Sequence, residues 1–222
     1  FISGEHFTIP FLGTAYFIPN PELKPETSYT IEGGVRTKFG RLKTNATWYH
    51  TEAEDFISTV HVSGMYPVGD WQAQNISHAR LYGIELGFEY ELSDSITLWG
   101  NYSQGKGDDL DAGEPLSGIA PESLKLGIDW ASETCGLRAG LRTRIYADQD
   151  RVPSDAEPAD GYQLYDFVSS WSPTGDNIPE FAKGFSVQFA VENLTDEEFT
   201  WFTGSPGHGI NPSVTLSYST SW

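Results

Sequence analysis

Hydrophobic and polar residues alternate with a period of two along almost the whole chain, which is the pattern of half-buried β-strands. The clearest runs lie at 28–39, 79–92, 95–103, 123–130, 137–146, 185–193 and 211–222. Two weaker runs lie near 42–60 and 162–171. Because no helical pattern separates neighbouring runs, the sequence predicts an all-β fold of nine antiparallel strands joined in order as a meander.

The links between these strands differ in length in an ordered way. Short links are expected near 40–41, 92–95 and 132–136, and long links rich in Gly, Pro and Asp near 61–71, 104–122, 148–161 and 203–210. Only the link at 172–184 breaks the alternation of short and long. One rim with tight turns and one with large loops is typical of a transmembrane β-barrel, and it favours that fold over a soluble β-sandwich.

Every second strand ends on an aromatic residue of its apolar phase. These residues are Phe39, Tyr90, Trp130, Trp171 and the terminal Trp222. Alternate strands of a meander run in the same direction, so these five residues are expected at one rim of the barrel. A ring of amphipathic aromatic side chains at a rim is the girdle of a membrane barrel in contact with lipid.

Composition and charge narrow the function. The 222 residues carry a net charge of −18, which argues against a nucleic-acid partner. The single Cys135 excludes an intrachain disulfide and a cysteine metal cluster. The longest uncharged run, 6–21, is broken by Pro10 and Pro19, so no transmembrane helix is expected. The chain begins on Phe1, and we expect it to be part of a longer protein.

Several motifs resemble the C-terminal part of the β-barrel of TonB-dependent outer-membrane receptors. The segment 19–36, PNPELKPETSYTIEGGVR, is similar to the family's passage from an external loop into a strand. The segments 75–90 (NISHARLYGIELGFEY) and 115–130 (PLSGIAPESLKLGIDW) resemble two of its strand motifs. VENLTDEEF at 191–199 resembles its Asn-Leu-x-Asp-x-x-Tyr element, with Phe199 in place of Tyr. The ending resembles the terminal aromatic signal for outer-membrane assembly.

The resemblance implies a fold in which this chain is one portion of a larger structure. Barrels of this class have about 22 strands around a plugged lumen. We therefore expect residues 1–25 to be an external loop and 26–222 to be about nine C-terminal strands, with the plug domain and the TonB-contacting segment absent. One departure is SPGHGINP at 205–212, where His208 replaces the arginine of the family's usual Pro-Gly-Arg.

The resemblance also implies an activity. It implies active import of a scarce nutrient across the bacterial outer membrane, driven by the TonB–ExbB–ExbD complex through a part of the protein outside this chain. NPELKPE at 20–26 resembles the haem, haemoglobin and haemophore receptors, although their companion Phe-Arg-Ala-Pro run is not in this sequence. Haem, free or carried by a protein, is the expected substrate, and a ferric siderophore is the alternative.

Candidate binding residues lie before this motif and on one strand. Neutral imidazole is a good axial ligand for haem iron, so His6 is the first candidate ligand and His208 a weaker one. The aromatic residues Phe7, Phe11 and Tyr16 could flank a porphyrin. Three arginines of 137–146 are expected to face the lumen: Arg138, Arg142 and Arg144. They either attract an anionic substrate or form ion pairs, with wall carboxylates such as Asp129 or with the plug.

Two further chemistries receive weaker support. Asp109, Asp111 and Glu114 could hold calcium through oxygen ligands, although a solvated acidic loop fits the spacing better. No catalytic motif is found, so an enzyme is not expected. A barrel lipase, which would need His50 or His78 beside a strand serine, and a passive porin remain alternatives from other classes.

Overall fold

The computed structural model describes residues 6–9, 13–64, 68–132, 134–154, 156–174, 178–179, 182, 184–201 and 204–219. Within them, no helix is long and apolar enough to cross a membrane. One sheet holds all the strands: β1 (His6–Ile9), β2 (Gly13–Ile18), β3 (Thr27–Phe39), β4 (Leu42–Ser63), β5 (Gly69–Glu91), β6 (Ile96–Asp109), β7 (Glu114–Pro115), β8 (Ser123–Ala131), β9 (Leu137–Tyr146), β10 (Tyr162–Trp171), β11 (Phe185–Glu192) and β12 (Asn211–Tyr218).

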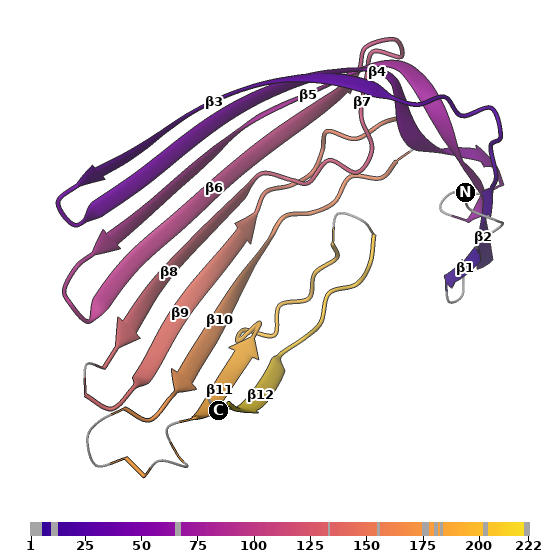
Figure 1. Ribbon diagram of the computed structural model, residues 1–222. Helices are drawn as coiled ribbons and strands as arrows, with labels where there is room; N and C mark the ends of the chain where they lie inside the picture. Colours follow the sequence, from indigo (N-terminus) through magenta and orange to yellow (C-terminus); the bar gives the residue numbers. More distant parts are fainter. Residues whose placement is uncertain are drawn as a thin grey trace.

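Nine of these strands form the predicted meander. From β3 to β12, leaving out the short β7, each strand pairs antiparallel with its neighbour in chain order. The sheet curves into a trough, and β3, β5, β8 and β10 all end at the same edge of it (Figure 1). The short links at 40–41, 92–95 and 132–136 lie at that edge, as does the longer link at 172–184. The all-β antiparallel prediction is confirmed.

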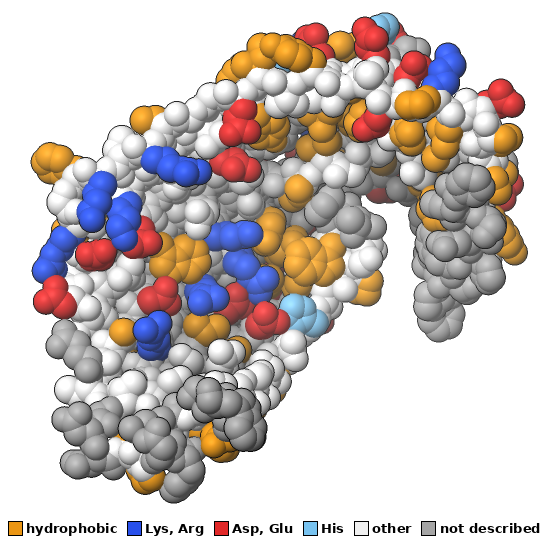
Figure 2. Space-filling model, viewed as in Figure 1, with side chains coloured by type: hydrophobic (Ala, Val, Ile, Leu, Met, Phe, Trp, Pro, Cys, Tyr) orange, Lys and Arg blue, Asp and Glu red, His pale blue; other side chains and the backbone are white. Residues whose placement is uncertain are grey.

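Because apolar and polar residues alternate along the strands, the two faces of the trough differ in character. On the convex face, side chains that are opposite one another across five neighbouring strands are apolar: Tyr90, Leu98, Ile128, Leu141 and Phe167. Tyr90, Ile128 and Leu141 are exposed, although they are large and apolar. Exposed apolar surface on this scale marks contact with an apolar partner. The concave face is hollow and carries most of the charged side chains in view (Figure 2).

Strands β4 and β5 continue far beyond their neighbours, with 22 and 23 residues. A membrane-spanning β-strand needs only about 10 residues, so roughly half of each strand projects past the trough. The expectation of a long loop at 61–71 is therefore wrong, because β4 continues to Ser63 and β5 begins at Gly69. Gly64 and Gly69 lie so close that a Cβ on either would collide with the other, and both have positive φ. Two glycines close this hairpin.

A second hairpin lies in the segment expected to be an external loop. β1 and β2 pair with each other, and β2 runs parallel to the first residues of β5, with Ala15 opposite Gly69 and Ile18 opposite Gln72. This hairpin hangs on the concave side of the trough, at the end away from the tight turns (Figure 1). The β1–β2 hairpin therefore occupies the mouth of the trough.

The NPELKPE segment fastens this hairpin to β5. The Asn75 carboxamide accepts from the Lys24 N–H at 2.8 Å and donates to the Lys24 carbonyl at 3.0 Å. Asn20 donates from its side chain to the carbonyl of Ala73 at 2.9 Å. The Asn75 side chain thus satisfies both backbone groups of Lys24, as a neighbouring strand would. Two of the motifs that carried the family resemblance meet at this contact.

Candidate functional site

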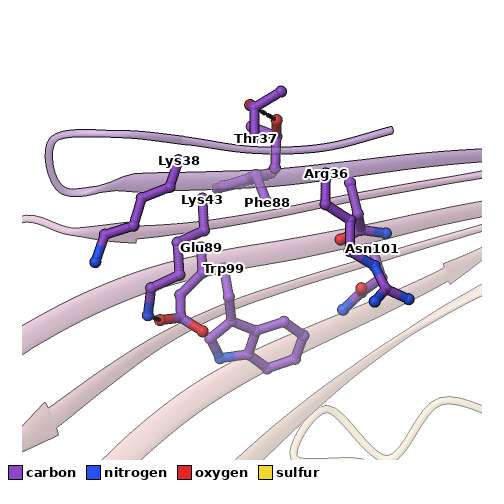
Figure 3. Close-up of a pocket in the computed structure, with 10 residues that line it drawn as sticks. Arg36, Thr37, Lys38, Lys43, Phe88, Glu89, Trp99 and Asn101 are labelled. Atoms are coloured by element: carbon purple, nitrogen blue, oxygen red, sulfur yellow. Dashed lines mark hydrogen bonds and ion pairs between the residues drawn. The ribbon is translucent and has the colours of Figure 1, made fainter. Parts of the chain in front are cut away.

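The concave wall carries rows of polar side chains whose order follows from the strand register. One row crosses six strands and consists of Lys43, Glu89, Trp99, Gly127, Arg142 and Asp166. Beside Lys43 and Trp99, near the tight turns, lies a hollow of about 630 Å³. Lys38, Lys43, Glu89 and Trp99 point to one side of the sheet there, while Thr37 points to the other (Figure 3). The wall therefore offers charged groups and an indole ring on its concave side.

Trp99 lies flat on this wall because its neighbours hold it there. A Cβ on Gly127 would collide with the indole ring, so the glycine makes room for it. The indole N–H donates to Asp129 Oδ2 at 2.7 Å, and the Arg142 guanidinium carbon lies 5.8 Å from the ring centre. A cation at this distance from an indole face is a cation–π contact.

Arg144 has a structural partner. Its Nε and Nη2 donate to the two oxygens of Asp166 at 2.7 and 2.9 Å. Asp166 is 5% exposed and also accepts the Asn193 backbone N–H at 3.0 Å. The sequence analysis left open whether Arg144 attracts a substrate or pairs with a carboxylate of the wall. The structure shows the pairing, and the carboxylate is that of Asp166. Asp129, the carboxylate named in the sequence analysis, holds Trp99 instead.

Arg138 and Arg142 differ from Arg144 in having no carboxylate partner among the described residues. Both side chains are exposed. They lie on the same phase of β9 as Arg144. The structure therefore separates the three predicted arginines into one that stabilises the wall and two that face the space of the trough.

The last long loop folds against the ends of β9 and β10. Asn193 is fully buried with a φ of 52°, and its carboxamide binds the backbone of Glu197 and the carbonyl of His208. Asp196 accepts the Ile210 N–H at 2.8 Å. The Asn-Leu-x-Asp motif thus ties the two limbs of the loop together. Aromatic rings stack along it, with centroids 4.4 to 6.4 Å apart: Tyr146, Tyr162, Phe199 and Trp201.

His208 lies at the edge of this aromatic cluster. Its Nε2 is 3.2 Å from Glu192 Oε2, and its ring packs edge-on against Phe199 at 6.1 Å. The ranking of His6 above His208 as a candidate haem ligand stays a prediction.

The His6 prediction falls on the β1–β2 hairpin. The strand register places His6 opposite Tyr16 and Phe7 opposite Ala15. Tyr16 is exposed, whereas Ala15 is buried. Phe11 lies outside the described residues. Of the predicted group, the structure thus brings His6 and Tyr16 together at the mouth of the trough.

The acidic loop after β6 uses its carboxylates internally. Asp109 accepts the backbone N–H groups of Asp111 and Ala112, both at 2.9 Å. Asp111 binds His78, whose Nδ1 lies 3.3 Å from Asp111 Oδ1. In the part of the chain that the structure describes, no group of three His, Cys, Asp or Glu residues is placed to hold a metal. Calcium at Asp109 and Asp111 stays a prediction.

Charge is unevenly divided between the two ends of the trough. Among the described residues, 18 acidic but only four basic ones lie at the end away from the tight turns, within 13–26, 52–64, 68–80, 104–122, 147–154, 156–161, 193–201 and 204–210. The other described residues include eight acidic and eight basic ones, which balance. The mouth is therefore strongly acidic, and the wall is close to neutral, with several cations that have no carboxylate partner among the described residues.

Four of the five predicted rim aromatics lie at the tight-turn edge. Phe39, Tyr90, Trp130 and Trp171 are all exposed, Phe39 to 85%. The Trp171 indole donates to the Cys135 carbonyl at 3.1 Å, which ties it to the neighbouring turn. Trp222 lies outside the described residues. Their role as a membrane girdle stays a prediction.

The two histidines that an outer-membrane lipase would need have other neighbours. The His50 ring stacks on Trp48 with centroids 6.1 Å apart, and its Nε2 lies 3.4 Å from Glu52 Oε1. His78 binds Asp111. Both rings thus face carboxylates of an exposed surface.

Sequence reasoning missed several residues of the wall. Trp99 received no role in the sequence analysis, because it is an aromatic residue at a position of the strand where alternation predicts a polar one. The sequence analysis also missed Asp166 and Lys38, since alternation gives the face of a side chain but not its neighbour across the strands. A sign was available at Gly127, because a glycine at a polar position of a strand leaves room for a large side chain from the neighbouring strand, here Trp99.

Comparison with known proteins agrees with this geometry. Residues 4–194 match the family described as TonB dependent receptor-like, beta-barrel. The heme/hemopexin utilization protein C of Haemophilus influenzae (strain ATCC 51907 / DSM 11121 / KW20 / Rd) is 31% identical over 99% of this chain and 33% of its own length. The hemin receptor of Yersinia enterocolitica is 28% identical over 97% of this chain and 33% of its own length.

Solved structures show the same fold. The copper transporter OprC superposes with a TM-score of 0.77 at 20% identity, over 89% of this chain and 32% of that chain. The chain spans about a third of the length of the curated relatives named above. The match over most of its residues shows that the chain belongs to the TonB dependent receptor-like β-barrel family, whose members are β-barrels of the outer membrane of Gram-negative bacteria.

Proposed function

We propose that this chain is part of a receptor that imports haem, free or delivered by a carrier protein, across the outer membrane. The observation that carries the proposal is the alignment of nearly the whole chain with proteins named for heme/hemopexin utilization and as a hemin receptor. Energy would come from the TonB–ExbB–ExbD complex, acting on a part of the receptor outside this chain. The outer edges of β3 and β12 have no partner among the described strands, so in this proposal further strands would pair with them and close the barrel in lipid.

The mouth and the wall would have different tasks in this import. His6 on the β1–β2 hairpin would ligate haem iron, with Phe7, Phe11 and Tyr16 beside the porphyrin. Arg138 and Arg142, which lack a carboxylate partner in the described part of the chain, would attract the two propionates as haem passes. This division agrees with a hairpin at the mouth and with cations further in that have no carboxylate partner among the described residues.

A ferric siderophore is the second candidate substrate. The ferrienterobactin receptor of Escherichia coli (strain K12) is 23% identical over 87% of this chain. A siderophore complex is also an anion, so the same wall cations would serve it. An outer-membrane enzyme is not proposed, because neither His50 nor His78 has a hydrogen bond to a serine among the described residues, and the family is one of transport receptors.

A visible-absorption titration of the purified full-length receptor with haemin tests the proposal. Wild type is expected to shift the Soret band as the iron gains a protein ligand, and His6→Ala is expected to weaken haem binding. One lost axial ligand in a partly open site should cost roughly tenfold or more in affinity, as seen when metal-site partners are removed.

His61→Ala is the control for this titration. His61 lies on the projecting part of β4, where its Nε2 is bound at 2.9 Å by the Val68 carbonyl, so its removal should leave the Soret shift unchanged. Identical spectra for wild type and His6→Ala would keep haem as the substrate but remove His6 from the site. No Soret change in wild type, together with tight binding of a ferric siderophore, would contradict the proposal.

A further inference from the structure

The hollow near the tight turns contains cations without carboxylate partners. Arg36 lies opposite Asn45, and Lys38 lies opposite Lys43. Lys43 is neutralised by Glu89 at 2.7 Å and Glu91 at 3.3 Å. Neither Arg36 nor Lys38 has an ion pair with any carboxylate of the described residues. Two positive charges are thus exposed toward the same hollow.

Two carboxamides converge beside these cations. A Cβ on Gly87 would meet Asn45 Oδ1 at 2.5 Å and Asn101 Oδ1 at 3.1 Å, so both amides lean over the glycine from neighbouring strands. The glycine leaves room for them to meet, and each carboxamide has N–H groups for an anion. The Asn45 and Asn101 amides therefore add hydrogen-bond donors next to Arg36.

The third component is a fixed flat surface. Trp99 forms the side of the hollow, with its N–H held by Asp129 and its ring lying over Gly127. A ring in this position cannot rotate freely, and it offers an aromatic face beside the cations. Figure 3 shows Arg36, Lys38, Trp99 and Asn101 directed to the same side of the sheet.

We propose that this hollow is a carboxylate-binding station at the tight-turn end of the wall, where Arg36 and Lys38 hold the carboxylate and Trp99 contacts the flat group that bears it. The proposal rests on the proposed function, in which the cargo is a planar dicarboxylate. The volume of about 630 Å³ accommodates a group of that size. A carboxylate side chain of the plug that fills such barrels is the other source of the same chemistry.

The uneven distribution of charge along the trough explains how a carboxylate-binding station at the tight-turn end would help import. An anionic cargo meets an acidic mouth and then, at the opposite end, cations that have no carboxylate partner among the described residues. Because the electrostatic energy of an anion falls along this path, the station would favour the inward step over return to the mouth.

The experiment uses the full-length receptor with Arg36→Gln and Lys38→Gln combined. The control is Arg41→Gln, which removes a cation of the adjacent turn that is already paired with Asp94 at 2.7 Å. Initial rates of energised uptake are measured for haem and for haem dimethyl ester, whose propionates carry no charge. The haem dissociation constant at the external site and the urea concentration that releases the plug are measured in parallel.

If the cargo supplies the carboxylate, the double variant should take up haem about tenfold more slowly, with an unchanged external dissociation constant and an unchanged rate for the ester. If the plug supplies it, both rates should fall together and the plug should be released at lower urea. Uptake rates and plug release equal to those of Arg41→Gln would overturn the proposal. A wild-type receptor that ignores haem but imports a siderophore would refute the proposed function alone, since plug release still tests the station.

Discussion

Replacing Phe189 by arginine should prevent most of the receptor from reaching its folded state in the outer membrane. Phe189 lies in the middle of β11 on the convex face, opposite Ser169 and Val214 and 6.2 Å from the Phe167 ring. An arginine on the lipid side of a barrel costs about 2–4 kcal/mol at the middle of the bilayer, and the phenyl packing is lost in addition. The folded fraction is measured from the heat-modifiable mobility of the receptor in isolated outer membranes.

Gln188→Arg is the matched control, because it places the same side chain one residue earlier on the same strand. Gln188 belongs to the concave phase of β11, where a charged group faces water. The control variant should fold like wild type, within roughly 1 kcal/mol. Equal folded fractions for the two variants would show that the assignment of the two faces is wrong.

Replacing Asp166 by alanine should be the most destabilising change on the concave wall. It leaves the Arg144 guanidinium without its two hydrogen bonds and the Asn193 N–H without an acceptor, in a place where Asp166 is almost fully buried. Removing one partner of a buried ion pair costs about 3–5 kcal/mol. Urea unfolding, followed by tryptophan fluorescence, should show a clearly lower midpoint.

The external loop provides a second readout for this variant. Because the Asn193 N–H binds Asp166, loss of the carboxylate should also expose the loop 193–210 to external protease. Asp94→Ala is the control, since it breaks an exposed pair with Arg41 that is worth about 0–1 kcal/mol. The ion-pair account fails if Asp166→Ala and Asp94→Ala unfold at the same urea concentration.

Much of the sheet could be predicted because period two determines which face each side chain takes. Runs such as 185–193 keep their phase without interruption, so both the strand and its lipid-facing residues follow from the sequence. The segment 61–71 could not be predicted in this way. Its Gly and Pro residues have the composition of a loop, whereas the structure uses Gly64 and Gly69 to close a hairpin between two long strands.

The pairing of charged residues could be predicted only in part. Alternation placed Arg138, Arg142 and Arg144 on one face, but the choice of Asp166 as the partner of Arg144 depends on the register between β9 and β10. The family motifs likewise identified Asn75 and Asn193 as part of segments similar to the family, but the sequence did not show what these side chains bind. The structure shows that Asn75 binds the backbone of Lys24 and that Asn193 has a positive φ, which suits an asparagine.

Uptake of radioactive iron from haem by cells that produce the full-length receptor tests the central claim most directly. Cells that lack other haem receptors should accumulate the label only when the receptor is present and the proton gradient is intact, because TonB-dependent import needs that energy. Collapse of the gradient should abolish uptake but leave binding at the surface unchanged. Accumulation that continues without the gradient, or no accumulation from haem beside ready uptake of a ferric siderophore, would contradict the account.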